Sequence, residues 1–186
     1  MDNLTTPVMV TGARPAARAF HGSVDGASVL RLSGPVRFMV ARALRRIVDD
    51  VIAHDDGGGV AIDLRTVDVI DSTALGLLAR IGSASLRRRG RRAVLICPDN
   101  DVATCLRSAA LDELFVMLDE YPYDDSVPLA EIALEMPAGG AEPELGRLIL
   151  DAHRDLARIS ERNLAVYGDV IAALEADLGE PPRSTH

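Results

Sequence analysis

Residues 59–81 read GVAIDLRTVDVIDSTALGLLARI, and the two halves of this stretch have different periodicities. Residues 60–64 form a short apolar run, VAIDL, which is typical of a strand buried on both faces of a sheet. In the second half the apolar residues recur at helical spacing, as at Leu75, Leu78 and Ala79. The stretch therefore predicts a strand, a short loop and a helix.

Small polar residues lie where this helix is expected to begin. Asp71, Ser72 and Thr73 separate the second apolar run from the helical pattern. A hydroxyl or carboxylate at the N-cap accepts a hydrogen bond from a backbone N–H that has no partner inside the helix. We therefore expect Ser72 to be the N-cap, with Asp71 supplementing the cap. Gly82 lies on the apolar stripe, which predicts a close approach by a neighbouring element.

The segment Asp71-Ser72-Thr73-Ala74-Leu75-Gly76 resembles the signature of the STAS domain, Asp-Ser-(Ser/Thr)-(Gly/Ala)-(Leu/Ile)-Gly. This family includes the bacterial anti-sigma-factor antagonists, in which a partner kinase phosphorylates the first serine of the motif. The resemblance implies that Ser72 is the phosphorylated residue, with Thr73 as the backup acceptor. It also implies that residues 71–74 (Asp71, Ser72, Thr73 and Ala74) contact the partner.

One segment departs from the antagonist pattern. Antagonists commonly carry Gly-x-Leu-Asp after the second strand, whereas this chain reads GPVRF at residues 34–38. Arg37 takes the place of the acidic residue, which reverses the charge, and GPVRF looks closer to the corresponding segment of STAS domains in anion transporters. We include Arg37 and Phe38 in the expected partner surface, and the difference leaves open which kinase the chain would bind.

The order of the expected elements predicts an α/β fold, with a mixed, mostly parallel sheet of about five strands and helices packed on it, because repeated strand–helix alternation favours parallel pairing. This is also the STAS order. Asp25-Gly26 suits a tight turn between the first two strands. The expected strands are 17–24, 28–32, 60–64, 93–97 and 114–118, and the expected helices are 38–54, 72–87, 99–108 and a final turn or two at 127–134.

Composition limits the class of protein. Of 186 residues 48% are hydrophobic, yet only 3% are aromatic and Trp is absent, so the core is expected to be aliphatic. A net charge of −8 argues against general nucleic-acid binding. The sequence has no apolar run of membrane-spanning length and no charged-then-apolar leader. We therefore expect a cytoplasmic protein without direct membrane insertion.

The sequence shows no pattern of an enzyme or a metal site. Cys97 and Cys105 are eight positions apart, which is no metal-ligand spacing, and both are interpreted as buried free thiols. The four histidines are scattered. The arginine-rich run 87–92 fits a solvated turn, with binding of phosphate or an acidic partner as the alternative. No cofactor and no catalytic residue is expected.

The expected domain plan is a flexible leader at 1–14, the STAS domain at 15–135, a linker at 136–143 and an amphipathic helical extension at 144–180. The apolar face of this extension must fold back on the domain, pair with a second copy through 144–178, or meet a partner. Asn163 interrupts its heptad seam. This residue either fixes the register of a self-paired coil or faces solvent.

Two functions follow from the resemblance. In the first, the chain is an anti-sigma-factor antagonist-like binding protein. Its unphosphorylated form would bind an anti-sigma factor or related serine kinase, phosphorylation of Ser72 would end binding, and a serine phosphatase would restore it. In the alternative, the chain is a non-phosphorylated STAS docking subunit of a transport or signalling scaffold complex, and Ser72 is only a helix cap.

Overall fold

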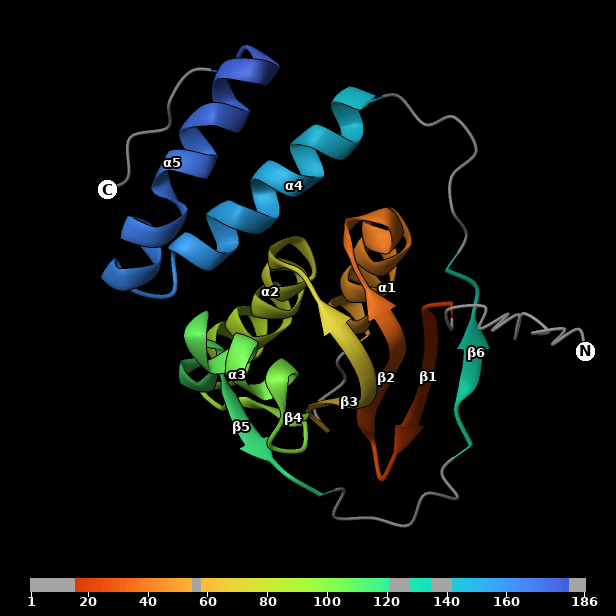
Figure 1. Ribbon diagram of the computed structural model, residues 1–186. Coiled ribbons are helices and arrows are strands. Elements are labelled where there is room, and N and C mark those ends of the chain that lie inside the picture. The colour runs from red at the N-terminus through yellow and green to blue at the C-terminus, as the bar shows by residue number, and fades with distance from the viewer. Residues whose placement is uncertain (1–15, 55–57, 121–127, 135–141, 181–186) are drawn as a thin grey trace, which may run out of the picture.

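The structure is a computed structural model that describes residues 16–54, 58–120, 128–134 and 142–180. Its centre is a six-stranded sheet in the order β5-β4-β3-β2-β1-β6 (Figure 1). β2 to β5 are parallel, whereas β1 pairs antiparallel with both β2 and β6. The strands are β1 Arg18–Val24, β2 Ala27–Val36, β3 Val60–Ile70, β4 Ala93–Ile96, β5 Phe115–Leu118 and β6 Ala130–Ile132.

The helices of the sheet domain pack on one face of this sheet. Right-handed crossovers between parallel strands that are added in one direction place all the connecting helices on the same side. Alternate residues of β3 (Val60, Ile62 and Leu64) join these helices in one apolar core. The helices are the 3₁₀ turn η1 Phe38–Val40, α1 Ala41–Ala53, α2 Ser72–Arg89, α3 Asp101–Ser108 and the 3₁₀ turn η2 Leu111–Glu113.

The prediction of a mixed, mostly parallel α/β domain is confirmed, as is the aliphatic core. Phe115 is the one aromatic residue among the largest fully buried side chains of the described residues, and the others are Leu and Ile. Asp25 and Gly26 have φ values of 49° and 80°, so the expected tight turn joins β1 to β2. A Cβ added to Gly82 would lie 2.8 Å from atoms of Leu114 and Phe115, which is the close approach predicted for this glycine.

The prediction of a helical turn at 127–134 is wrong for residues 128–134, which the structure describes. Residues 130–132 form β6, which extends the sheet from the edge of β1. A run this short carries too little periodicity to distinguish a strand from a helix. The open edge of β1 decides the outcome, because it offers unpaired backbone groups. The bidentate ion pair of Arg18 with Glu131, at 2.7 and 2.9 Å, supports this pairing.

The C-terminal extension is two helices instead of the one long helix that was expected. α4 spans Glu142–Ala157 and α5 spans Glu161–Leu178. Ser160 ends the continuity because it caps α5, where its hydroxyl accepts a hydrogen bond from the Asn163 N–H at 3.2 Å. The two helices lie side by side as a helical hairpin, and α4 packs on α2 (Figure 1). Of the three possible coverings of the apolar face, the chain uses folding back on the domain.

Two smaller expectations also change. Cys97 is buried, but Cys105 is exposed on α3, so the interpretation of both cysteines as buried thiols is wrong for Cys105. The inward-facing residues of this short helix are Val102, Ala103 and Leu106. The leader 1–14 and most of the linker 136–143 lie outside the described residues, and the remainder of the linker belongs to α4. Across the described ranges, none of the helices combines the length and apolarity that a membrane span requires.

Candidate protein-docking surface around Ser72

Asp71, and not Ser72, caps α2. Asp71 has extended backbone angles, and its Oδ1 accepts a hydrogen bond from the Ala74 N–H at 3.0 Å. Its Oδ2 accepts a second hydrogen bond, from the Phe38 N–H, at 2.6 Å. One carboxylate therefore accepts a hydrogen bond from a free N–H in the first turn of α2 and also connects this helix start to the segment after β2. The sequence pattern identifies the helix start correctly but assigns the cap one residue too late.

Ser72 is the first residue of α2, and its hydroxyl is hydrogen-bonded to the C-terminal hairpin. Ser72 Oγ lies 3.0 Å from His153 Nε2, and His153 Nδ1 lies 2.8 Å from the carbonyl oxygen of Ile149. Because a carbonyl can only accept, Nδ1 carries the proton, and in the neutral ring Nε2 accepts from the serine O–H. His153 is buried and Ser72 half-buried. The histidine therefore holds the hydroxyl that the motif singles out.

The other predicted surface residues divide into a buried and an exposed group. Thr73 and Ala74 are buried, so the backup acceptor Thr73 lies beneath the surface. Arg37 is exposed, and Phe38 and Met39 keep 46% and 51% of their surface accessible. Asp71 connects the two groups through its bond to Phe38. The structure thus brings the 37–38 segment beside the start of α2, as a common docking surface requires.

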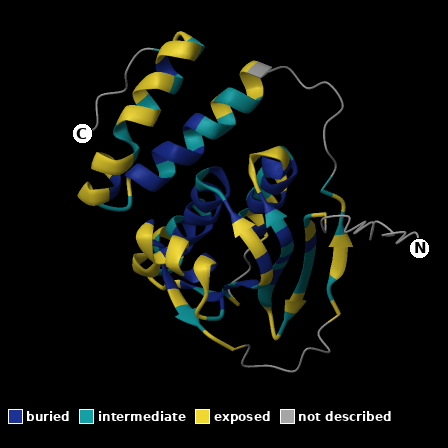
Figure 2. Cartoon of the chain, in the orientation of Figure 1, coloured by how far each residue is buried: buried dark blue, intermediate teal, exposed yellow. Residues whose placement is uncertain are grey.

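Helix α4 covers the outer face of α2. A Cβ added to Gly76 would lie 2.2 Å from the carbonyl oxygen of Ala152, so the two helix backbones approach closely here. Leu156 of α4 is fully buried and joins the core of the sheet domain. The C-terminal half of α4 is the buried half (Figure 2). As a result α2 is enclosed between the sheet and the hairpin, which explains why its apolar and small residues extend around the helix.

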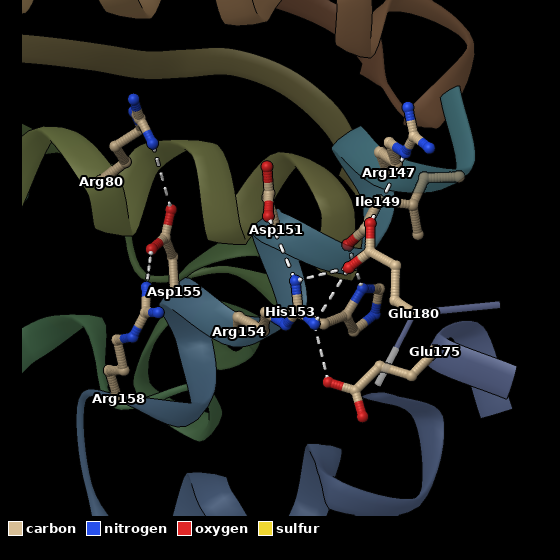
Figure 3. A network of polar contacts seen from close by, with 10 residues as sticks. All are labelled: Arg80, Arg147, Ile149, Asp151, His153, Arg154, Asp155, Arg158, Glu175 and Glu180. Atoms are coloured by element: carbon tan, nitrogen blue, oxygen red, sulfur yellow. Dashed lines mark hydrogen bonds and ion pairs between the residues drawn. The ribbon is translucent and has the colours of Figure 1, made fainter. Parts of the chain in front are cut away.

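Charged residues line the border between α4 and α2. Arg80 of α2 lies 3.8 Å from Asp155 of α4, and Arg158 lies 2.9 Å from Asp155 (Figure 3). Arg80 also lies 3.2 Å from Asp49 of α1. Burial raises the pKa of Asp155, although Arg158 and Arg80 oppose that shift. A cleft lined by polar residues opens beside this border, with Arg87 and Arg88 among its lining residues. The contact between the hairpin and the domain is thus apolar at its centre and charged at this edge.

A buried guanidinium holds the two helices of the hairpin together. Arg154 lies 2.8 Å from Glu175 and 3.3 Å from Glu180, with Asp151 at 3.6 Å (Figure 3). The side chains of Arg154 and Glu175 are only 8% and 10% exposed. A buried charge needs such partners, because an unpaired one costs several kcal/mol. The hairpin therefore has polar contacts of its own.

Asn163 has neither of the roles that the sequence left open. The residue is buried, and its Nδ2 donates to the carbonyl oxygens of Ala109 at 2.8 Å and of Leu156 at 3.0 Å. It therefore connects α5 both to α4 and to the end of α3. Sequence reasoning also missed His153, because its partner Ser72 lies 81 positions away and an isolated histidine carries no local signal.

Arginines of the turn at 87–92 donate hydrogen bonds to neighbouring backbone. Arg88 donates to the carbonyl of Ile52, and Arg92 donates to the carbonyl of Asp112 at 3.0 Å. Gly90 ends α2 with φ of 63°, the left-handed conformation that is common directly after a helix C-terminus. These contacts give the run a structural role at the end of α2, away from Ser72.

The sequence model of the STAS domain matches residues 22–127, which is more than half of the chain. The chain therefore belongs to the STAS domain family. The C-terminal hairpin lies outside the matched residues.

The solved structures that are similar to the chain include two from bacteria. One is an anti-sigma factor antagonist from Mycobacterium paratuberculosis, with 24% identity, a TM-score of 0.47, and coverage of 59% of this chain and 89% of that one. The other is the Bacillus cell fate determinant SpoIIAA in the phosphorylated form, with 17% identity, a TM-score of 0.43, and coverage of 55% and 92%. No curated protein matches the sequence at a significant level.

Proposed function

We propose that the chain is a regulatory protein-binding module of the anti-sigma-factor-antagonist type, and not an enzyme, whose docking surface surrounds Ser72. The observation that carries this proposal is the position of the Ser72 hydroxyl, at the N-terminus of α2 and next to the exposed 37–39 segment. The partner would be an anti-sigma factor or related serine kinase that binds the unphosphorylated form. This reading also expects a cytoplasmic protein that acts in transcription regulation.

Phosphorylation of Ser72 would change the docking surface more than the fold. A phosphoryl group adds about −1.5 to −2 charges and three acceptor oxygens. The positive end of the α2 dipole favours this charge locally, whereas Asp71 beside it and an apolar or acidic partner surface do not. The added charge would therefore release the partner, and a serine phosphatase would restore binding.

Substitutions at Ser72 test this proposal against the docking-subunit alternative. The chain is incubated with ATP and a purified serine kinase of the anti-sigma-factor type from the same organism, and phosphopeptides are identified by mass spectrometry. We expect phosphate on Ser72, retained pull-down of the kinase by Ser72→Ala, and at least a tenfold loss with Ser72→Asp. Ser108→Asp, on the exposed end of α3, is the matched control and should bind like wild type.

Unmodified Ser72 together with equal pull-down by all variants would reject the phosphorylation switch. That result would favour the STAS docking subunit, in which the contact of Ser72 with His153 is purely structural.

A further inference from the structure

The C-terminal hairpin occupies the surface of the STAS domain that carries Ser72. His153 accepts the hydrogen bond of the Ser72 hydroxyl, and the backbone of Ala152 lies against Gly76, one helical turn further on. Both contacts come from α4, which lies outside the matched STAS region. Helix α4 therefore occupies the position that a partner docking on the first turns of α2 would need.

The hairpin packs on α2 without joining the sheet. The hairpin contributes no strand to the sheet, and the Arg154 cluster joins its two helices without a bond to α2. Its polar contacts with the domain come from the buried side chains of His153 and Asn163 and from Asp155 at the charged edge. Water can replace such hydrogen bonds at a small net cost, because each contributes only about 0.5–1.5 kcal/mol. Leu156 is fully buried in the domain core, and Leu145, Leu148, Ile159 and Tyr167 pack against that core.

The close approach at Gly76 defines what can replace α4. Only an element without a bulky side chain at the crossing point can approach the α2 backbone as closely as Ala152 does. An acidic group beside that point can pair with Arg80, as Asp155 does. A helix with a small residue at the crossing and a carboxylate one turn away satisfies both conditions.

We propose that the α4–α5 hairpin is an autoinhibitory cover on the Ser72 surface, which a partner helix of this kind must displace. The proposal rests on the proposed function for the identity of the surface. It adds that access to Ser72 is controlled by the chain itself.

The cover can be tested with a thiol placed at the site in the full chain. The starting protein carries Ser72→Cys together with Cys105→Ser, which removes the exposed native thiol. Cys97 is buried, and this burial raises its pKa to about 11, so its thiol stays protonated at pH 8 and reacts slowly. The measured quantity is the rate with a polymer-linked maleimide divided by the rate with a small maleimide. This ratio cancels any effect of His153 on thiolate reactivity.

Two substitutions open the hairpin from opposite sides. Leu156→Arg removes the α4 side chain that is fully buried in the domain core, and Gly76→Ala places a methyl group against the Ala152 backbone. We expect each to raise the rate ratio at least tenfold. Val166→Arg makes the same kind of change at a residue of α5 that is 59% exposed, and should leave the ratio within twofold.

Amide hydrogen exchange of β3 and β4 shows whether the domain remains folded. An unchanged ratio in folded Leu156→Arg and Gly76→Ala overturns the proposal. Loss of protection in the sheet of both variants also overturns it, because the hairpin would then be part of the domain fold. The experiment contains no kinase or partner, so a failure of the proposed function leaves its result unaffected. Conversely, an absent cover predicts phosphorylation of Ser72 at the same rate in the wild-type and opened chains.

Discussion

The buried polar groups of the sheet domain and of the C-terminal hairpin have different structural roles. In the domain, the buried carboxylate of Asp63 lies between Arg31 at 2.8 Å and Arg65 at 3.0 Å, in a fold that an aliphatic core already stabilises. In the hairpin, Arg154 and Asn163 connect elements directly, alongside buried apolar residues such as Leu150 and Leu156. Apolar burial scales with area and resists local opening, whereas polar connections can be exchanged with water. Leu156 is the one described hairpin residue in the buried core cluster of the domain, so we expect the hairpin to separate at lower cost than the sheet opens.

The largest expected effect is at Phe115, which is fully buried against Gly82. Phe115→Ala should lower the free energy of unfolding by about 3–5 kcal/mol, because it removes a large side chain and leaves a cavity. Chemical denaturation monitored by circular dichroism measures this change. If the hairpin and the sheet lose protection together at equal cost in hydrogen exchange, the distinction between the two regions fails.

The second expected effect is at Arg154. Arg154→Ala leaves Glu175 buried without its partner, and should destabilise the hairpin by about 2–4 kcal/mol. Hydrogen exchange should show faster opening of α4 and α5 with unchanged protection in β3. The double variant Arg154→Met with Glu175→Leu should recover most of this loss, because it removes both charges. Equal loss of protection in β3 would contradict the comparison.

The third expected effect is at Asp63 and depends on pH. Burial alone would raise the pKa of Asp63, but hydrogen bonds from Arg65 and Arg31 outweigh it and hold this pKa below its ordinary value. A carboxyl with a lowered pKa contributes stability that is present above the unfolded-state pKa, about 3.9, and is lost as pH falls through the folded-state value. Asp63→Asn should cost about 1–3 kcal/mol at pH 7 and flatten the acid limb of stability against pH. An acid limb identical to that of wild type would show that Asp63 does not titrate in this way.

The smallest expected effect is at Arg158, which is 63% exposed and pairs with Asp155 three residues earlier. Arg158→Ala should change stability by less than about 0.5 kcal/mol, because exposed ion pairs contribute little. The variant serves as the control for Arg154→Ala, because Arg158 lies in the turn directly after α4. A loss of stability as large as that of Arg154→Ala would show that exposed ion pairs stabilise the hairpin as much as the buried one does.

The sheet domain could be predicted from the sequence because its signals are local. The apolar run of β3, the polar cluster before α2 and the Asp25-Gly26 turn each act within a few residues. The prediction of β6 failed because the open edge of β1, about a hundred residues away, decides its conformation. Local pattern cannot report such a partner.

The docking surface could be predicted only in part, for the same reason. The motif identifies Asp71 and Ser72, but the contact of Ser72 with His153 joins elements that are far apart in the chain. The heptad-like spacing of the extension indicates an amphipathic helix without showing that Ser160 divides it. Asn163 interrupts that seam because its side chain donates to the carbonyls of Ala109 and Leu156. The periodicity of a helix carries no information about such partners.

Because α4 belongs to the same chain as α2, its effective concentration at the Ser72 surface does not change with the amount of protein in the cell. If the cover is open for a fraction f of the time, the apparent dissociation constant of a partner is its intrinsic value divided by f. Each 1.4 kcal/mol removed from the hairpin contact would therefore tighten apparent binding about tenfold while the cover is mostly closed. Substitutions at Leu156 or Asn163 thus offer a way to set the response threshold without altering the residues that the partner contacts.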